Sequence, residues 1–347
     1  MRIFTSGLVV GLLAGASGCG GLQLKLQHAS VQKPSNVVLY FAVEDSRGQG
    51  VPALAADAFK IYEDDQLVSP FESKQTILNP EVAVSHYVLL LVDLSGSITE
   101  SGSLPALTSA VSAFVERVSK SQVVQIAVYG FDGSPKLTPL VGFTRQGLAV
   151  SSAMSWLTGR KAKDPSTNLN GAIVEGVSVL EKQVSKSNMP LRFATMVVFT
   201  DGTDRAHRVA WEKVEEKVDQ AQVNLYAIGL GAELSEDHLS KIGRAGYVKA
   251  ERQEDMNKAF EEMATKIESA GRKYYLLSYC SPSRAGTHRL RVEATTKEGS
   301  GDLSREFKAE GFGPNCDPNQ KPNFSPTRIL IEARRKEKAE EKAKRSE

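Results

Sequence analysis

The stretch LLLVDLSGSITES, residues 89–101, determines how the rest of the chain is interpreted. Its apolar run predicts a strand that is buried on both faces. The run stops at Asp93, and two hydroxyl side chains follow on alternate positions, at Ser95 and Ser97. Oxygen ligands placed directly after a buried strand indicate a functional site at the edge of a sheet, where ligands of open α/β sheets bind.

The surrounding segment alternates strand patterns with helix patterns. Apolar, β-branched runs form HYVLLLVD (86–93), QVVQIAVYGF (122–131), FATMVVFT (193–200) and NLYAIGL (224–230). Between and after them, apolar residues recur at helical spacing within 104–118, 173–180 and 256–267. This alternation predicts an α/β domain over 85–270, with a doubly wound, mostly parallel sheet covered by helices on both faces.

The segments on either side of this domain have β patterns. Residues 36–82 contain NVVLYFAVED and FKIYEDDQLV, separated by a turn, and residues 274–313 contain YYLLSYC, HRLRVEATT and SREFKAEGF. We expect the two segments to pack together as a β-sandwich module into which the α/β domain is inserted. Residues 314–347 are expected to form a Pro/Asn-rich linker and a charged tail.

The N-terminus has the layout of an export signal. Residues 1–18 combine an early cation with a short apolar stretch and small residues, which is typical of a secretion signal. The sequence ASGC, ending at Cys19, resembles a bacterial lipobox, so Cys19 is the expected lipid-modified residue and membrane contact. A plain signal peptide with an incidental cysteine is the alternative. The polar residues 19–35 are interpreted as a tether.

Export to an oxidising compartment would determine the state of the two remaining cysteines and the location of the protein. In an oxidising compartment we expect Cys280 and Cys316 to form a disulfide, with two free buried thiols as the alternative. Gly20 follows Cys19, where an Asp favours inner-membrane retention in many diderm bacteria. We therefore expect a lipoprotein of the cell envelope, at the outer membrane or on a periplasmic or extracellular face.

Three separated segments deliver oxygen ligands to the predicted sheet edge. Asp93, Ser95 and Ser97 follow the first strand, and Asp201 follows a later one in the sequence TDG. Thr167 opens a helix beside the same edge, in DPSTN. Carboxylates and hydroxyls without sulfur or imidazole suit Mg²⁺, Mn²⁺ or Ca²⁺.

Together, DLSGS (93–97), STN (166–168) and FTDG (199–202) resemble the von Willebrand factor type A domain and its metal-ion-dependent adhesion site. The resemblance implies one divalent ion, Mg²⁺ foremost. It also implies direct coordination by Ser95, Ser97 and Thr167, with Asp93 and Asp201 acting mainly through bound waters. One coordination position would remain for a carboxylate of a partner protein.

This sequence also departs from the family pattern. Pro165-Ser166 replaces the Gly that usually precedes the threonine. The resemblance covers residues 85–270, and the segments on either side resemble, more loosely, the β regions around this domain in bacterial exported proteins.

The composition and the absence of catalytic and phosphate-binding motifs limit the classes of function that we expect. A net charge of +2, from 43 basic and 41 acidic residues, argues against a nucleic-acid partner. The sequence contains no G-x-S-x-G, H-E-x-x-H or phosphate-binding G-x-x-x-x-G-K motif, so we do not expect an enzyme. We expect a lipid-anchored protein that binds an acidic protein ligand through a divalent ion. A metal-stabilised structural component of the envelope and a metal-assisted hydrolase are the alternatives.

Overall fold

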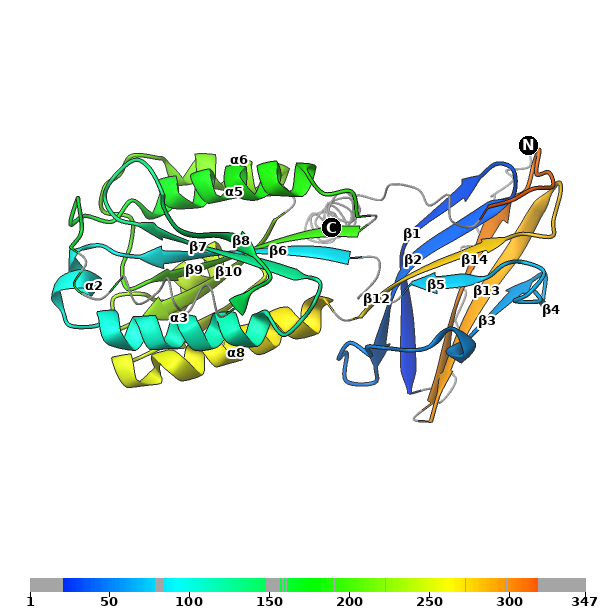
Figure 1. Ribbon diagram of the computed structural model, residues 1–347, viewed down its shortest axis with the longest axis horizontal. Coiled ribbons are helices and arrows are strands. Elements are labelled where there is room, and N and C mark those ends of the chain that lie inside the picture. The colour runs from blue at the N-terminus through cyan, green and yellow to red at the C-terminus, as the bar shows by residue number, and fades with distance from the viewer. Residues whose placement is uncertain are drawn as a thin grey trace, which may run out of the picture.

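The computed structural model describes residues 21–78, 84–147, 157, 159, 161–189, 191–221, 223–271, 273–297 and 299–317. The predicted signal peptide, Cys19 and most of the linker and tail lie outside these residues. The predicted fold class is confirmed, because an α/β domain with a mixed six-stranded sheet is joined to two four-stranded antiparallel sheets (Figure 1). None of the helices in the described ranges is long and apolar enough to cross a membrane.

The central sheet has the strand order β11-β10-β9-β6-β7-β8. Neighbouring strands run parallel except at one edge, where β8 is antiparallel to β7. The strands are β6 (Val84–Asp93), β7 (Val124–Phe131), β8 (Thr138–Thr144), β9 (Leu191–Thr200), β10 (Val223–Leu230) and β11 (Gly246–Ala250). All ten residues of β6 are buried, which explains its uninterrupted apolar run.

Helices cover both faces of this sheet (Figure 1). One face packs against α3 (Leu104–Val118) and α8 (Met256–Gly271), and the other against α5 (Leu169–Ser185), α6 (Trp211–Gln220) and α7 (Glu236–Ile242). The short helix α2 (Gly96–Glu100) follows β6, and the 3₁₀ turn η3 (Gln253–Asp255) precedes α8. Alternate residues of β6 point to opposite faces of the sheet. Leu90 belongs to the hydrophobic core on the α3 side, and Leu89 belongs to the core on the α5 side.

The two antiparallel sheets are built from both ends of the chain. The first has the order β1-β2-β12-β5 and the second β14-β13-β3-β4. Their strands are β1 (Leu22–Gln32), β2 (Asn36–Asp45), β3 (Phe59–Glu63), β4 (Gln66–Leu67), β5 (Thr76–Leu78), β12 (Tyr274–Cys280), β13 (Thr287–Thr296) and β14 (Gly299–Lys308); the 3₁₀ turn η1 spans Ala56–Ala58. Because β2 pairs with β12 and β3 with β13, the α/β domain is inserted into this β module.

The predicted tether over 19–35 is wrong over most of its length. Residues 22–32 form β1, which pairs antiparallel with β2. The apolar side chains of Leu22 and Leu24 alternate with the polar Gln23 and Lys25, and both leucines are buried. Period-2 alternation is a strand signal even in a segment that is mostly polar.

The first antiparallel sheet is buried on both faces along β2. Leu39 and Phe41 belong to the sandwich core, whereas Tyr40 belongs to the same hydrophobic cluster as α3 and α8. A row of rings joins the two parts of the molecule, which we call the aromatic joint: His86, Phe193, Tyr274 and Tyr40. Their successive ring centroids are 6.0, 5.3 and 5.2 Å apart. One hydrophobic cluster therefore contains residues of both the α/β domain and the β module.

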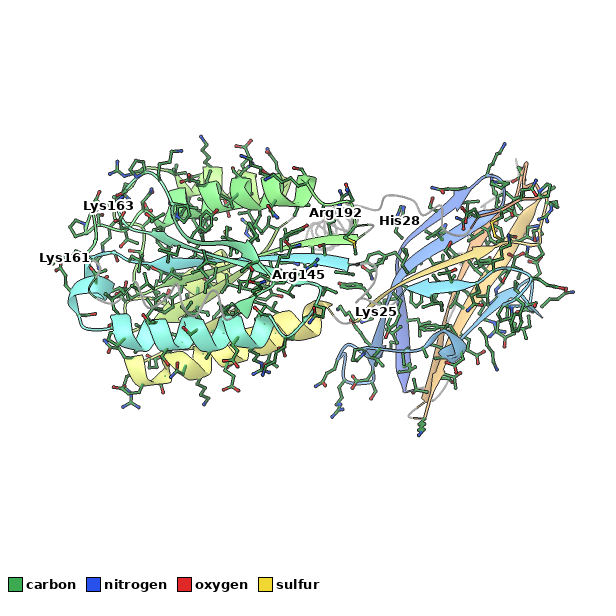
Figure 2. All side chains as sticks on the ribbon, viewed as in Figure 1. Lys25, His28, Arg145, Lys161, Lys163 and Arg192 are labelled. Atoms are coloured by element: carbon green, nitrogen blue, oxygen red, sulfur yellow. A yellow bond between two sulfur atoms is a disulfide. The ribbon has the colours of Figure 1, made fainter. Side chains whose placement is uncertain are left out.

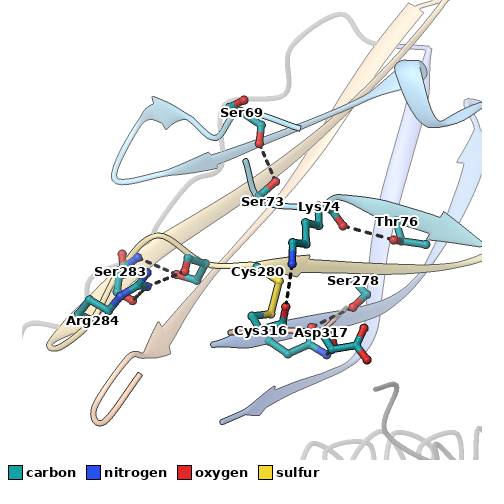
Figure 3. Close-up of a disulfide and its surroundings, with 12 residues drawn as sticks. Ser69, Ser73, Lys74, Thr76, Ser278, Cys280, Ser283, Arg284, Cys316 and Asp317 are labelled. Atoms are coloured by element: carbon teal, nitrogen blue, oxygen red, sulfur yellow. Dashed lines mark hydrogen bonds between the residues drawn. A yellow bond between two sulfur atoms is a disulfide. The ribbon is translucent and has the colours of Figure 1, made fainter. Parts of the chain in front are cut away.

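A disulfide ties the chain after β14 to the end of β12. Cys280 and Cys316 are bonded, with their Cα atoms 5.8 Å apart (Figure 3). Lys74 Nζ donates to the Cys316 carbonyl at 3.3 Å, and Asn36 Nδ2 donates to the Asp317 carbonyl at 3.4 Å. The disulfide to β12, the hydrogen bond from Asn36 of β2 and the hydrogen bond from Lys74 hold the segment around Cys316 against the first antiparallel sheet.

Candidate metal site at the strand ends

The structure brings the five predicted metal residues together at the carboxyl end of the sheet. Asp93 is the last residue of β6, Ser95 precedes α2, and Ser97 lies in that helix. The hydroxyls of Ser95 and Ser97 are 3.1 Å apart, and Ser97 Oγ donates to Asp201 Oδ1 at 2.9 Å. Thr167 lines the same hollow as Ser97 and Asp201. Two carboxylates and three hydroxyls are thus gathered at one place.

Asp93 is fully buried, with none of its surface exposed. Its Oδ1 accepts from the Ser95 amide at 2.9 Å, and its Oδ2 accepts from Thr200 Oγ1 at 2.7 Å. Burial, together with the nearby negative charge of Asp201, raises the pKa of Asp93 to about 6. Two carboxylates at a buried site are costly without a counter-charge. The residues present therefore fit a divalent cation.

The hydroxyls are not used as helix caps, which is the ordinary role of Ser or Thr before a helix. Ser95 occupies the N-cap position of α2, but its side chain makes no capping hydrogen bond. Thr167 stands one residue before Asn168, the N-cap of α5, and the Asn168 side chain makes no capping hydrogen bond either. The hydroxyl of Ser95 points instead to Ser97.

A glycine is required at position 96 because the backbone there lies close to Pro165. Its backbone does not adopt a left-handed φ, so conformational freedom does not explain the glycine. Its amide donates to the Pro165 carbonyl at 2.9 Å, and a Cβ at this position would lie 3.0 Å from the Pro165 Cβ. Pro165, which departs from the family pattern, thus contacts the loop that carries Ser95 and Ser97.

Asp132, a residue that the sequence analysis missed, holds the loop that carries Thr167. It directly follows β7. Its carboxylate accepts from the amides of Ser134 at 2.8 Å, Lys163 at 2.9 Å and Asp164 at 3.4 Å. Burial opposes ionisation here, but these hydrogen bonds outweigh it and lower the pKa of Asp132. Its position after a strand is the same signal that identified Asp93.

Asp204 is a second missed residue. Its side chain is only 10% exposed and accepts from the amides of Asn170 and His207, each at 3.0 Å. It therefore fixes the loop after β9 to the first turn of α5, close to Thr167.

The site opens into a hollow of about 400 Å³. Ser97, Thr167 and Asp201 line it, together with Arg205 and Glu233, whose side chains form an ion pair at 2.6 Å. Burial raises the pKa of Asp201, the charge of Glu233 adds to this, and Arg205 opposes it. Both side chains thus lie within electrostatic reach of the metal residues.

Two lysines lie at the same end of the domain. Figure 2 shows Lys161 and Lys163 at the same end of the α/β domain as α2. Both are exposed, and in the described part of the chain neither has a carboxylate within ion-pair distance. They add positive charge at this end of the domain.

A second hollow, of about 610 Å³, lies in the β module beside the disulfide. The buried carboxylate of Glu63 on its wall already accepts hydrogen bonds from Tyr279 at 2.8 Å and Ser283 at 2.7 Å.

Across the described ranges, no three His, Cys, Asp or Glu side chains cluster closely enough to hold a metal by themselves. A cation at the strand ends would therefore depend on the hydroxyl oxygens as well as the carboxylates.

Comparison with known proteins agrees with this geometry. The family model described as "von Willebrand factor type A domain" matches residues 88–268, which is more than half of the 347 residues. Among curated proteins, the inter-alpha-trypsin inhibitor heavy chain H3 of Pongo abelii is 26% identical over 159 residues, covering 45% of this chain. This chain spans only 18% of the length of that relative.

Several solved structures are similar to this chain. A von Willebrand factor type A protein from Catenulispora acidiphila has a TM-score of 0.46 at 12% identity, over 89% of this chain and 77% of that one. The mussel byssus proximal thread matrix protein 1 "with zinc occupied MIDAS motif" has a TM-score of 0.42 at 16% identity, over 60% and 49%. The pilus adhesin SpaC of Lactobacillus rhamnosus GG has a TM-score of 0.43 at 9% identity, over 82% and 47%. At these scores the individual structures carry no argument about ligands.

Proposed function

Because the chain belongs to the von Willebrand factor type A domain family, we propose that its strand-end site binds one divalent cation and, at that ion, an acidic side chain of a protein ligand. The observation that carries this proposal is the buried Asp93 beside Asp201, surrounded by three hydroxyls. Hard oxygen donors of this kind suit Mg²⁺ first, with Mn²⁺ or Ca²⁺ as alternatives.

The roles proposed for these residues are those that the resemblance to the family implies. Ser95, Ser97 and Thr167 would contact the ion directly, while Asp93 and Asp201 would act mainly through water. Ser97, Thr167 and Asp201 line the open hollow, so a ligand can reach the ion from that side.

We further propose that the protein is exported and anchored through Cys19 in the cell envelope, at the outer membrane or on a periplasmic or extracellular face. The signal-like residues 1–18 and the Cys280–Cys316 disulfide, a bond typical of oxidising compartments, support this location. Cells supplied with radiolabelled palmitate should label the protein. The Cys19→Ala variant should remain unlabelled, and equal labelling of the two would contradict the anchor.

The first experiment is a melt of the soluble protein that begins after Cys19, in EDTA and with Mg²⁺ or Mn²⁺. An ion at about 100 times its dissociation constant stabilises the folded state by roughly 2.7 kcal/mol. This corresponds to a rise in Tm of about 5–10 °C for a domain of this size. Asp201→Ala should lose the rise, whereas Glu212→Ala, which removes an exposed acid on α6, should keep it.

The outcomes separate the candidate functions. A rise without any metal-dependent protein partner in pulldowns would favour the metal-stabilised envelope component. Metal-dependent turnover of ester, peptide or phosphoester panels would favour the hydrolase. If neither ion moves the Tm of the wild-type protein, the metal site itself is refuted.

A further inference from the structure

An ion pair spans the hollow beside the proposed metal site. Arg205 comes from the loop after β9, and Glu233 comes from the loop between β10 and α7. Arg205 Nη2 donates to Glu233 Oε2 at 2.6 Å. Both residues line the same hollow as Ser97 and Asp201. The guanidinium and its carboxylate partner are therefore neighbours of the position where a ligand would enter.

The backbone of Arg205 is fixed to a proposed metal ligand. The amides of Arg205 and Ala206 both donate to the Thr167 carbonyl, at 2.9 and 3.0 Å. Asp204, the preceding residue, holds the first turn of α5 through the Asn170 amide. The starting point of the Arg205 side chain is thus set relative to Thr167, while its guanidinium end is free to change partners.

The ion pair is easily exchanged. The side chains of Arg205 and Glu233 are 59% and 65% exposed. Exposed ion pairs contribute little to stability, so an incoming carboxylate can replace Glu233 at little cost. A guanidinium presents a planar fork of donors that matches any carboxylate, including one supplied by a ligand.

Two other charged side chains of the hollow, those of Arg252 and Glu251, have partners close by in the sequence. Arg252 lies 3.8 Å from Asp255, and Glu251 pairs with Lys249 at 3.1 Å. Arg205 differs, because in the described part of the chain Glu233 is the carboxylate within ion-pair distance of it, 28 positions away. This pair bridges two loops that both border the site.

We propose that Arg205 is a specificity-determining residue that binds a second carboxylate of the ligand, and that Glu233 occupies its guanidinium until the ligand arrives. The ligand would then be an acidic protein segment with two neighbouring carboxylates, one at the ion and one at Arg205. This inference rests on the proposed function, because it assumes that the first carboxylate binds at a metal.

The test compares two capped, fluorescent tripeptides, Asp-Gly-Glu and Asp-Gly-Gln, which differ by one carboxylate. Their affinities for the Mn²⁺-loaded protein are measured by anisotropy. The wild-type protein should bind the diacid about tenfold more tightly, as expected for one added hydrogen-bonded charge. Arg205→Gln should abolish the preference and Glu233→Gln should increase it. Glu212→Gln, which removes an exposed carboxylate on α6 that does not line the hollow, should leave it unchanged.

Uptake of Mn²⁺ alone, followed by electron paramagnetic resonance in each variant, separates the two proposals. If the wild-type protein takes up no Mn²⁺, both proposals fail. If Mn²⁺ binds but the peptides bind equally or not at all, this inference is overturned and the metal site stands. A diacid preference that persists in Arg205→Gln would likewise overturn it.

Discussion

At the scale of single residues, Asp93 is suited to a cation and poorly suited to an empty site. Its carboxyl is fully buried, and its pKa is raised to about 6 from 3.8. In EDTA at pH 7, Asp93→Asn should therefore increase the free energy of unfolding, by at most about 3 kcal/mol. The same change should remove the rise in Tm caused by Mn²⁺. Urea unfolding with and without the ion measures both effects.

The sign of the pH dependence follows from the raised pKa. Between about pH 6 and pH 4 the folded protein holds a proton on Asp93 that the unfolded chain has released, so protonation favours the folded state as the pH falls. The advantage of Asp93→Asn should thus shrink from pH 7 to pH 4. His86, whose pKa burial lowers to about 4, acts in the opposite direction in both proteins and cancels in the comparison. An advantage that is equal at both pH values would contradict this account.

Most of the metal residues could be predicted because each follows an apolar strand or opens a helix. Asp132 follows β7 in the same way and was within reach of the same rule. The Arg205–Glu233 ion pair could not be predicted by this rule, because it depends on how two loops approach each other. Thr200 was visible in the TDG sequence, but its hydrogen bond to Asp93 requires β6 and β9 to be neighbours.

At the scale of elements, the loop before α5 depends on Asp132. Replacing this residue with Ala removes the acceptor of the Ser134, Lys163 and Asp164 amides and frees the loop that carries Thr167. The affinity for Mn²⁺ should fall about 10- to 100-fold, as is typical when a residue that supports a metal ligand is lost.

Isothermal titration of Mn²⁺ into the variant measures this change. Asp45→Ala is the matched control, because Asp45 likewise accepts from backbone amides, those of Arg47 and Gln49, but lies in the β module. The control should bind Mn²⁺ as the wild-type protein does. Unchanged affinity in Asp132→Ala would show that Thr167 does not need this support.

Helices and strands were predicted more accurately in segments where apolar residues are frequent and regularly spaced. The helices α3, α5 and α8 and the strands β6, β7, β9 and β10 lie where their patterns placed them, whereas β8 and β11 were not predicted. β1 was missed because half of its positions are polar and its partner, β2, was needed to reveal the pairing. This strand is covered mainly on one face, so its signal is weaker than the continuous apolar run of a strand buried on both faces.

At the scale of the whole molecule, the aromatic joint could not be predicted, because His86, Phe193, Tyr274 and Tyr40 come from four distant segments. Two of these rings lie in the α/β domain and two in the β module, and Phe193 stacks on Tyr274 across the boundary. Since hydrophobic contacts continue through this joint, the wild-type protein should unfold in one calorimetric transition.

Phe193→Ala should divide that transition in two. Removing a buried ring costs about 3–5 kcal/mol and takes away the contact with Tyr274. Mn²⁺ should then raise only the transition of the α/β domain, because a ligand stabilises the unit that binds it, whereas in the wild-type protein the single transition should move as a whole. Phe143→Ala, which removes a ring paired with Tyr87 inside the α/β domain, should lower stability without dividing the transition. Two transitions in the wild-type protein, or one shared metal response in Phe193→Ala, would show that the joint does not couple the two parts.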